Sequence, residues 1–103
     1  MSNMLSVINN EKGFKVIRMP IYTMRKIFHG TLCICDSCLA DLSYGFYIPV
    51  INQILCPDCF DKFIKRAKWH KEDSIIENKR YDDVISKIKS EVSTEITTDN
   101  YAI

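Results

Sequence analysis

Two CxxC pairs constrain this chain more than any other feature of its sequence. The first pair is Cys35 and Cys38, the second is Cys56 and Cys59, and residues 39–55 separate them. With two residues between the cysteines, both sulfur atoms of a pair can point to one side of a tight turn, as zinc–sulfur bonds of about 2.3 Å require. Two such pairs at this separation are typical of a four-cysteine zinc site. We therefore expect these cysteines to bind one structural Zn²⁺ ion.

The number of cysteines argues against a disulfide scaffold. The chain has five, and an odd count is unusual for a small secreted protein. The fifth, Cys33, lies outside both CxxC turns and is interpreted as a buried small side chain or a reduced thiol. Residues 1–10 lack the features of a signal peptide, and no apolar run approaches the roughly twenty residues that span a bilayer. These features favour a soluble protein in the cytoplasm.

Two other kinds of cysteine site use similar motifs. Iron sites of the rubredoxin kind also have two CxxC turns, but glycine usually follows their second cysteine, whereas Leu39 and Phe60 occupy these positions here. A redox-active pair at Cys56 and Cys59 is the second alternative, because a CxxC pair that opens a helix has a lowered thiol pKa. That interpretation leaves the first pair unexplained. Zinc therefore accounts best for the whole motif.

The segments around the second pair predict a hairpin followed by a helix. Residues 39–55 are rich in aromatic and branched side chains, which indicates two short strands joined by a turn near Pro49 or at residues 52–53. Because proline cannot donate to a strand ladder, Pro49 predicts that its strand lies at an edge. After Cys59, apolar residues recur at helical spacing, so the second pair should lie in the first turn of a helix. The apolar residues of this helix are Phe60, Phe63, Ile64 and Ala67.

This order of cysteine turn, hairpin and helix resembles the treble-clef class of zinc fingers. The likeness is greatest to the second half of a LIM module, in which a glycine-aromatic hairpin such as residues 45–47 lies between two CxxC pairs. The resemblance covers residues 33–70. A complete LIM or RING module holds two metal ions with eight ligands, whereas this chain has only four cysteines at ligand spacing. The resemblance therefore implies one structural zinc ion and argues against a ubiquitin-ligase role.

Upstream of the first pair, the sequence predicts strands. Apolar and polar residues alternate in part over residues 14–19 and 21–28, with an interruption at Pro20. A turn at residues 29–30 would lead into a third strand over residues 31–35.

Downstream, the sequence predicts a long helix over residues 74–92. Ser74 and Glu77 have the spacing of a capping box at its start. Its apolar stripe is Tyr81, Val84, Ile85, Ile88 and Val92. The predicted fold is α+β, with a flexible N-terminus over residues 1–13, a zinc-binding module over 14–71, a C-terminal helix over 72–92 and a flexible tail over 93–103.

Charge is unevenly distributed along the chain, although the net charge is only +1. Residues 1–71 hold ten lysines and arginines against five acidic residues, and residues 72–103 hold four against eight. The basic excess is concentrated on the helix after Cys59. Its candidate contacts to nucleic acid or to a protein partner are Lys62, Lys65, Arg66, Lys68 and Trp69. Alternatively, these side chains form a solvated helix face.

No catalytic set accompanies the cysteines. The only histidines, His29 and His70, are not at ligand spacing to either pair, and zinc with four thiolate ligands has no open position for water. We therefore expect a protein that is not an enzyme and has no small-molecule substrate.

Two functions remain open at this point. The first is a zinc-stabilised adaptor or inhibitor that binds a larger protein or nucleoprotein. The chain is similar to small accessory proteins of phages and bacterial mobile elements, which implies a regulator of the anti-CRISPR type. The second is an RNA-binding or single-stranded-DNA-binding zinc finger that uses the basic helix, with possible additional contacts from Arg18, Arg25 and Lys26.

Overall fold

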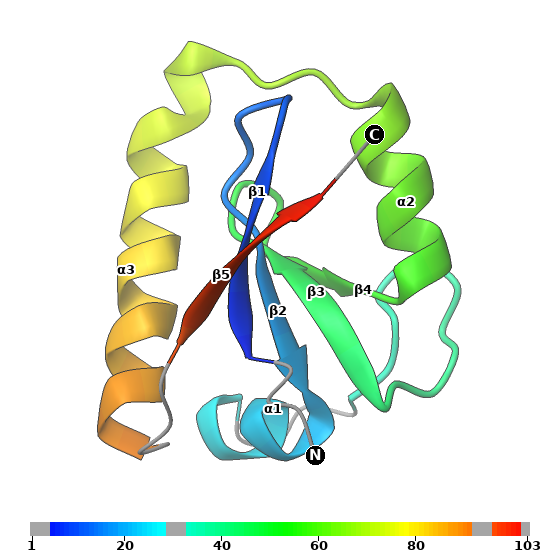
Figure 1. Ribbon diagram of the computed structural model, residues 1–103, viewed down its shortest axis with the longest axis vertical. Helices are drawn as coiled ribbons and strands as arrows, with labels where there is room; N and C mark the ends of the chain where they lie inside the picture. Colours follow the sequence, from blue (N-terminus) through cyan, green and yellow to red (C-terminus); the bar gives the residue numbers. More distant parts are fainter. Residues whose placement is uncertain (1–4, 29–32, 92–95, 102–103) are drawn as a thin grey trace.

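A five-stranded sheet organises the computed structural model of this protein, which describes residues 5–28, 33–91 and 96–101. Along the chain, the elements are β1 (Ser6–Asn10), β2 (Ile17–Pro20), α1 (Ile21–Ile27), β3 (Tyr44–Ile48), β4 (Gln53–Leu55), α2 (Pro57–Arg66), a 3-10 helix (Lys71–Asp73), α3 (Ser74–Glu91) and β5 (Thr97–Tyr101). The predicted α+β class is confirmed. Figure 1 shows the sheet with α3 on one side and α2 on the other.

The strand order is β4-β3-β2-β1-β5. Neighbouring strands from β4 to β1 pair antiparallel, with short connections between β1 and β2 and between β3 and β4, and with α1 in the longer connection from β2 to β3. β5 is different, because it pairs parallel to β1 with Ser6 opposite Thr97. The first and last strands of the chain therefore lie side by side at one edge of the sheet (Figure 1).

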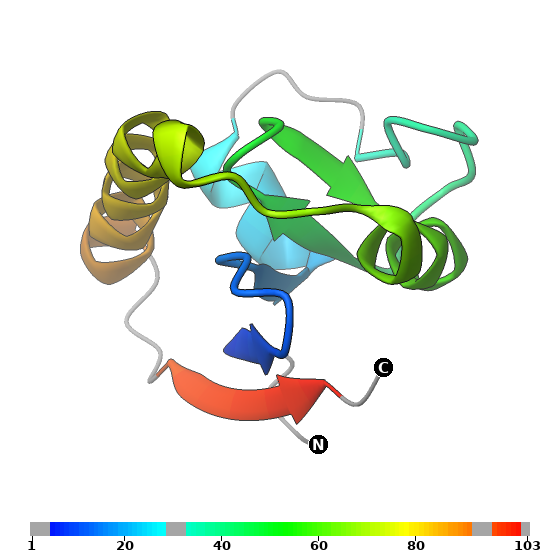
Figure 2. The same cartoon turned by 90° about the horizontal axis from the view of Figure 1, so that it is seen from above.

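The core lies between the sheet and its helices. α1 and α3 pack against each other, and they bury Met24, Ile27, Val84 and Ile88. α2 covers a different part of the sheet, so α2 and α3 stand apart in both views (Figure 1, Figure 2). The C-terminal helix therefore does not fold over the basic helix.

Aromatic rings attach α2 to the sheet. Phe60 of α2 is fully buried and stacks on Phe46 of β3, with ring centroids 4.3 Å apart and planes at 6°. The ring of Tyr101, at the end of β5, meets the edge of this stack with its centroid 4.9 Å from that of Phe60. One aromatic cluster thus joins a helix, an inner strand and the last strand of the chain.

Gly45 is required in β3 by close packing. A Cβ atom at this position would lie 2.7 Å from the Cγ2 atom of Ile54 and 3.1 Å from the Cε atom of Met24. Both distances are shorter than an ordinary carbon–carbon contact. The glycine of the predicted hairpin therefore lets β3 pack between β4 and α1.

Several predicted elements are confirmed. The two strands expected within residues 39–55 are β3 and β4, the helix after the second pair is α2, and the long C-terminal helix is α3. The prediction of an edge strand at Pro49 is wrong. Pro49 lies in the turn after β3, and β3 itself is paired on both sides.

Three other predictions are wrong. Residues 21–27 form helix α1 instead of a strand, because Thr23, Met24 and Ile27 are buried at helical spacing. Ser6–Asn10 and Thr97–Tyr101 were expected to be loose, but they form β1 and β5. The predicted turn at residues 29–30 lies outside the described residues. Of the strand predicted over residues 31–35, the described part contributes only a single bridge between Ile34 and Asp41.

The proposed capping box at the start of α3 is also absent. Ser74 already has helical backbone angles, because the 3-10 helix leads directly into α3. The Glu77 carboxylate, 2% exposed, instead accepts hydrogen bonds from the backbone amide of Lys15 at 3.0 Å and from the Trp69 indole nitrogen at 3.1 Å. Glu77 therefore joins α3 to the segments that precede β2 and follow α2.

Candidate metal centre

The first cysteine pair lies in a tight turn before β3. The backbone amide of Cys35 donates to the carbonyl of Ala40 at 2.9 Å, and the amide of Leu39 donates to the carbonyl of Cys35 at 3.0 Å. Leu39 has φ of 65°, in the left-handed region that favours glycine. The turn that glycine usually completes therefore forms here with leucine. The absence of glycine is thus no longer an argument against iron.

The second pair opens helix α2. Cys56 is the N-cap residue, and its sulfur accepts a hydrogen bond from the backbone amide of Cys59 at 3.4 Å. Pro57 follows at the first helical position, where the missing amide costs nothing because it would have no partner in the helix. The predicted placement of the second pair in the first turn of a helix is confirmed.

Asp36 holds the two turns together. Its backbone amide donates to the carbonyl of Ile54 at 2.9 Å, and its carboxylate accepts from the amide of Ile54 at 2.7 Å. Ile54 belongs to β4, which ends directly before Cys56. This two-bond clamp sets the separation of the cysteine pairs. Sequence reasoning missed Asp36, and its position directly after Cys35 was the only available signal.

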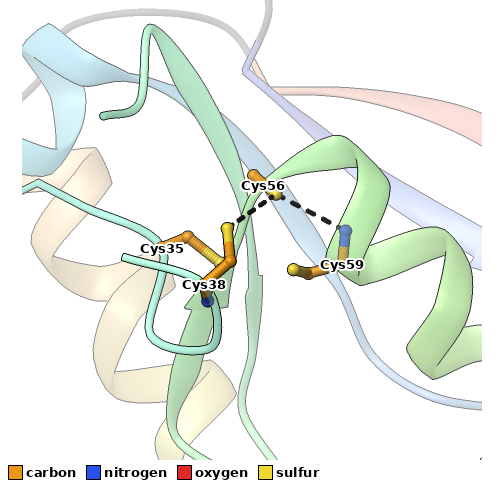
Figure 3. Close-up of side chains that lie close together, drawn as sticks. All are labelled: Cys35, Cys38, Cys56 and Cys59. Carbon is orange, nitrogen blue, oxygen red and sulfur yellow. Dashed lines mark hydrogen bonds between the residues drawn. The ribbon is translucent and has the colours of Figure 1, made fainter. Parts of the chain in front are cut away.

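The structure brings the four predicted metal ligands together (Figure 3). The Sγ atoms of Cys35, Cys38, Cys56 and Cys59 all lie within 4.8 Å of one another. The Sγ atoms of Cys38 and Cys56, which come from different turns, are 3.7 Å apart. In a tetrahedral shell with metal–sulfur bonds of about 2.3 Å, the sulfurs are about 3.8 Å apart. The cluster can therefore hold one metal ion after small side-chain adjustments.

The electrostatics of the cluster also suit a cation. Burial opposes ionisation of Cys35, but backbone amides, led by that of Cys38, outweigh it and lower the pKa of this thiol to about 6. The neighbouring Cys56 side chain, burial and the other sulfurs raise the pKa of Cys59 to about 12. The Cys35 thiol thus loses its proton easily, whereas the Cys59 thiol resists ionisation, because a second thiolate close to the first is unfavourable. A divalent cation would remove this conflict and hold all of the sulfurs as thiolates.

Cys33 lies outside the cluster. It is 6% exposed, in agreement with its interpretation as a buried small side chain. Its φ of 55° is in the left-handed region, and its carbonyl accepts from the amide of Leu42 at 3.3 Å. This backbone conformation directs the chain into the turn of the first pair.

The predicted basic surface is present in a modified form. Lys62, Lys65, Arg66 and Lys68 are exposed. Lys65 forms an ion pair with Asp61 at 2.9 Å. Trp69 does not belong to this surface, because it is partly buried and its indole nitrogen donates to Glu77.

Lys12 extends the basic surface from a different part of the chain. Its ammonium group donates to the carbonyl oxygens of Lys65 and Ala67, at 3.4 and 3.0 Å, at the end of α2. No sequence spacing indicated this contact, because it depends on the turn after β1. We define the basic face of α2 as Lys12, Lys62, Lys65, Arg66 and Lys68.

The other basic candidates lie elsewhere. Arg18 of β2 pairs with Asp99 of β5 at 2.6 Å, and Arg25 and Lys26 are exposed on α1, away from α2 (Figure 1). They do not form one surface with α2.

We expect Asp36→Ala to weaken metal binding by about tenfold or more, because residues that orient metal ligands typically contribute this much. Competition with a chelator of known affinity measures the change. Asp41→Ala is the matched control, since the Asp41 side chain is exposed and only its backbone takes part in the bridge to Ile34. Equal affinities of the two variants would contradict a clamp at Asp36.

In the described part of the chain, no helix has the length and apolar character needed to cross a bilayer. A scan against models of protein families, a search of curated proteins and a search of solved structures each find no match. Functional inference therefore depends on the geometry of this chain alone.

Proposed function

We propose that the four-cysteine cluster binds one structural zinc ion and that the protein is a non-catalytic module that docks onto a larger protein. The observation that carries this proposal is the convergence of four sulfurs from two separate turns within 4.8 Å. The Asp36 clamp and the start of α2 bring these turns together in the folded chain, and the Asp36 contacts to Ile54 involve no sulfur. Such a preformed thiolate cage is typical of structural zinc sites.

The choice of zinc follows from the donor set. Tetrahedral sites with four thiolates hold zinc or iron, and softer sulfur ligands disfavour magnesium and calcium. Zinc is redox-inert and closes its shell with four ligands, which leaves no position for a catalytic water. Metal analysis together with an absorption spectrum separates the two metals, since a ferric thiolate site absorbs visible light and a zinc site does not.

The arrangement around the cluster supports the treble-clef interpretation. A cysteine turn, the β3–β4 hairpin and α2 follow one another over residues 33–70, with one cysteine pair at each end of the hairpin. One zinc ion would then join the hairpin to the helix that carries the basic face.

The basic face of α2 is the proposed docking surface. The lysines and the arginine at its residues 62–68 are exposed, and helix α3 stands apart from α2 (Figure 2). Among the described residues, Asp61 is its only ion-pair partner. Such a face fits an acidic surface on a protein. Trp69, the aromatic residue that would suit base stacking, is partly buried and donates to Glu77, so it is held away from this face.

The adaptor or inhibitor role extends this proposal. A small rigid body with one charged face can block or bridge a larger assembly without chemistry of its own. The analogy with phage and mobile-element regulators, including those of the anti-CRISPR type, is compatible with a protein or nucleoprotein target in the cytoplasm. Nucleic acid is the alternative partner, because phosphate groups could also bind the basic face.

Charge reversal of the basic face tests the proposal. We expect Lys62→Glu with Arg66→Glu to reduce partner capture by about tenfold or more, because like charges then oppose docking. Capture from the native host is followed by cross-linking and mass spectrometry, and the cross-links should map lysines of α2 to acidic segments of one protein. Zinc content and circular dichroism should be unchanged.

Lys87→Glu with Lys89→Glu is the matched control, because both lysines are exposed on α3. This variant should capture the partner as the unchanged protein does. A salt-dependent anisotropy shift with RNA or single-stranded DNA that only the α2 variant loses would instead establish the nucleic-acid alternative.

A further inference from the structure

The four sulfurs of the metal centre differ in their surroundings. Cys35 is fully buried, and its sulfur accepts hydrogen bonds from the amides of Ser37 and Cys38 at 3.4 and 3.5 Å. Cys56 and Cys59 are partly buried, and only Cys38 is exposed. Hydrogen bonds from amides withdraw charge from a metal-bound sulfur and reduce its reactivity. Cys38 is therefore the sulfur that a small oxidant in solution can reach most easily.

A partner for an oxidised Cys38 lies close by in the other turn. The Sγ atoms of Cys38 and Cys56 are 3.7 Å apart (Figure 3). A disulfide needs a sulfur–sulfur distance of about 2.05 Å, so the two side chains must approach by roughly 1.6 Å. Cys38 lies in an exposed turn, residues 36–41, that has room to make this movement.

We propose that Cys38 and Cys56 form a peroxide-oxidisable pair, so that a disulfide between them replaces the zinc ion as the link between the first turn and α2. This inference rests on the proposed zinc site, which is the reduced form. Two-electron oxidation of the pair removes two of the four ligands, and the remaining Cys35 and Cys59 cannot retain the ion alone. The metal centre would then have two states, one with zinc and one with a disulfide.

The chemistry balances with hydrogen peroxide as the oxidant. The Cys38 thiolate attacks one peroxide oxygen, the O–O bond breaks, and the leaving hydroxide takes a proton to form water, which leaves Cys38 as a sulfenic acid. The Cys56 thiolate then attacks this sulfur, the S–O bond breaks, and a second hydroxide leaves and is protonated. In total, two thiolates lose two electrons, and one peroxide becomes two waters with two protons from solvent.

The disulfide state should keep the local fold. The bond joins Cys38 of the first turn to Cys56 of the second. Zinc would join the same two turns. The Asp36–Ile54 clamp, which brings these turns together, involves no sulfur. A bond between Cys56 and Cys59, within one helical turn, would leave the first turn unattached. The identity of the disulfide therefore distinguishes this proposal from the helix-opening redox pair considered from the sequence.

Peptide mapping of oxidised protein tests the proposal. Zinc-loaded protein is treated with a series of hydrogen peroxide concentrations, and released zinc is measured with a metallochromic dye. The protein is then blocked at its remaining thiols and cut before aspartate. Cleavage before Asp36, Asp41 and Asp58 places Cys38, Cys56 and Cys59 on three different peptides. Each disulfide among these three cysteines thus gives a distinct linked mass.

We expect zinc release to rise together with the linked peptides 36–40 and 41–57, and thiol reduction with added zinc to reverse both. Circular dichroism should change little. Cys33→Ser is the control, because Cys33 lies outside the cluster, and it should release zinc at the same rate. A bond at Cys35–Cys38 or Cys56–Cys59, or oxidation that leaves zinc bound, would overturn the proposal.

The same experiment separates the oxidisable pair from the structural zinc site. Zinc content before oxidation tests the structural zinc site, and a value near zero would refute that site. If zinc is present at about one ion per chain but the linked peptides do not form, only the oxidisable pair fails.

Discussion

Removal of zinc is expected to unfold residues 33–70. The first cysteine turn exposes residues 36–41 to solvent, so it has little apolar packing of its own. Structural zinc contributes on the order of 10 kcal/mol of apparent folding free energy in small domains. This is comparable to the roughly 5–15 kcal/mol that such a domain has in total. Loss of the ion should therefore remove most of the stability of this region.

Circular dichroism before and after chelation measures this effect. Cys35→Ser and Cys56→Ser should reproduce it without a chelator and should prevent normal folding. Cys33→Ser should have a mild effect, because Cys33 is not part of the cluster. Unchanged helix and strand signals after complete loss of metal would show that the ion is not structural.

Truncation of Phe60 should have the second-largest effect. Phe60→Ala removes a fully buried ring that stacks on Phe46 and also contacts Tyr101. The loss of this buried ring and the cavity that it leaves typically lower the free energy of unfolding by about 3–5 kcal/mol. Helix α2 would lose its main contact to the sheet, although zinc would still hold its first turn. Urea denaturation of the zinc-loaded variant measures the change in unfolding free energy.

Tyr22→Ala is the matched control for this change. Tyr22 is also aromatic, but it is 55% exposed on α1, and exposed positions usually change stability by less than about 0.5 kcal/mol. A loss below about 1 kcal/mol in Phe60→Ala would indicate that zinc, and not the aromatic cluster, holds α2 in place.

Local patterns in the sequence were sufficient for the metal centre and the two longer helices. The CxxC spacing determines which sulfurs can point together, because two intervening residues form one tight turn. The apolar residues of α2 and α3 recur at helical spacing, so each helix was visible within its own segment. These features depend on residues that are close in the sequence.

Other features depended on contacts between distant segments. Strand β5 has the sequence TTDNY and four exposed residues, so it has no apolar pattern to indicate a strand. It is a strand because it pairs with β1 at the other end of the chain. Likewise, Lys12 belongs to the basic face because it contacts Ala67, which is distant in the sequence, and Trp69 does not, because it contacts Glu77 on helix α3.

The sequence by itself determined that four cysteines form two matched turns and that a basic amphipathic helix begins at the second turn. The tertiary structure alone decided that the first and last strands complete the sheet, that Asp36 sets the separation of the turns, and which sulfur is exposed. The physical reason is the range of the interactions. Turn geometry and helical spacing are local, whereas strand pairing, burial and side-chain hydrogen bonds depend on residues that only the folded chain brings together.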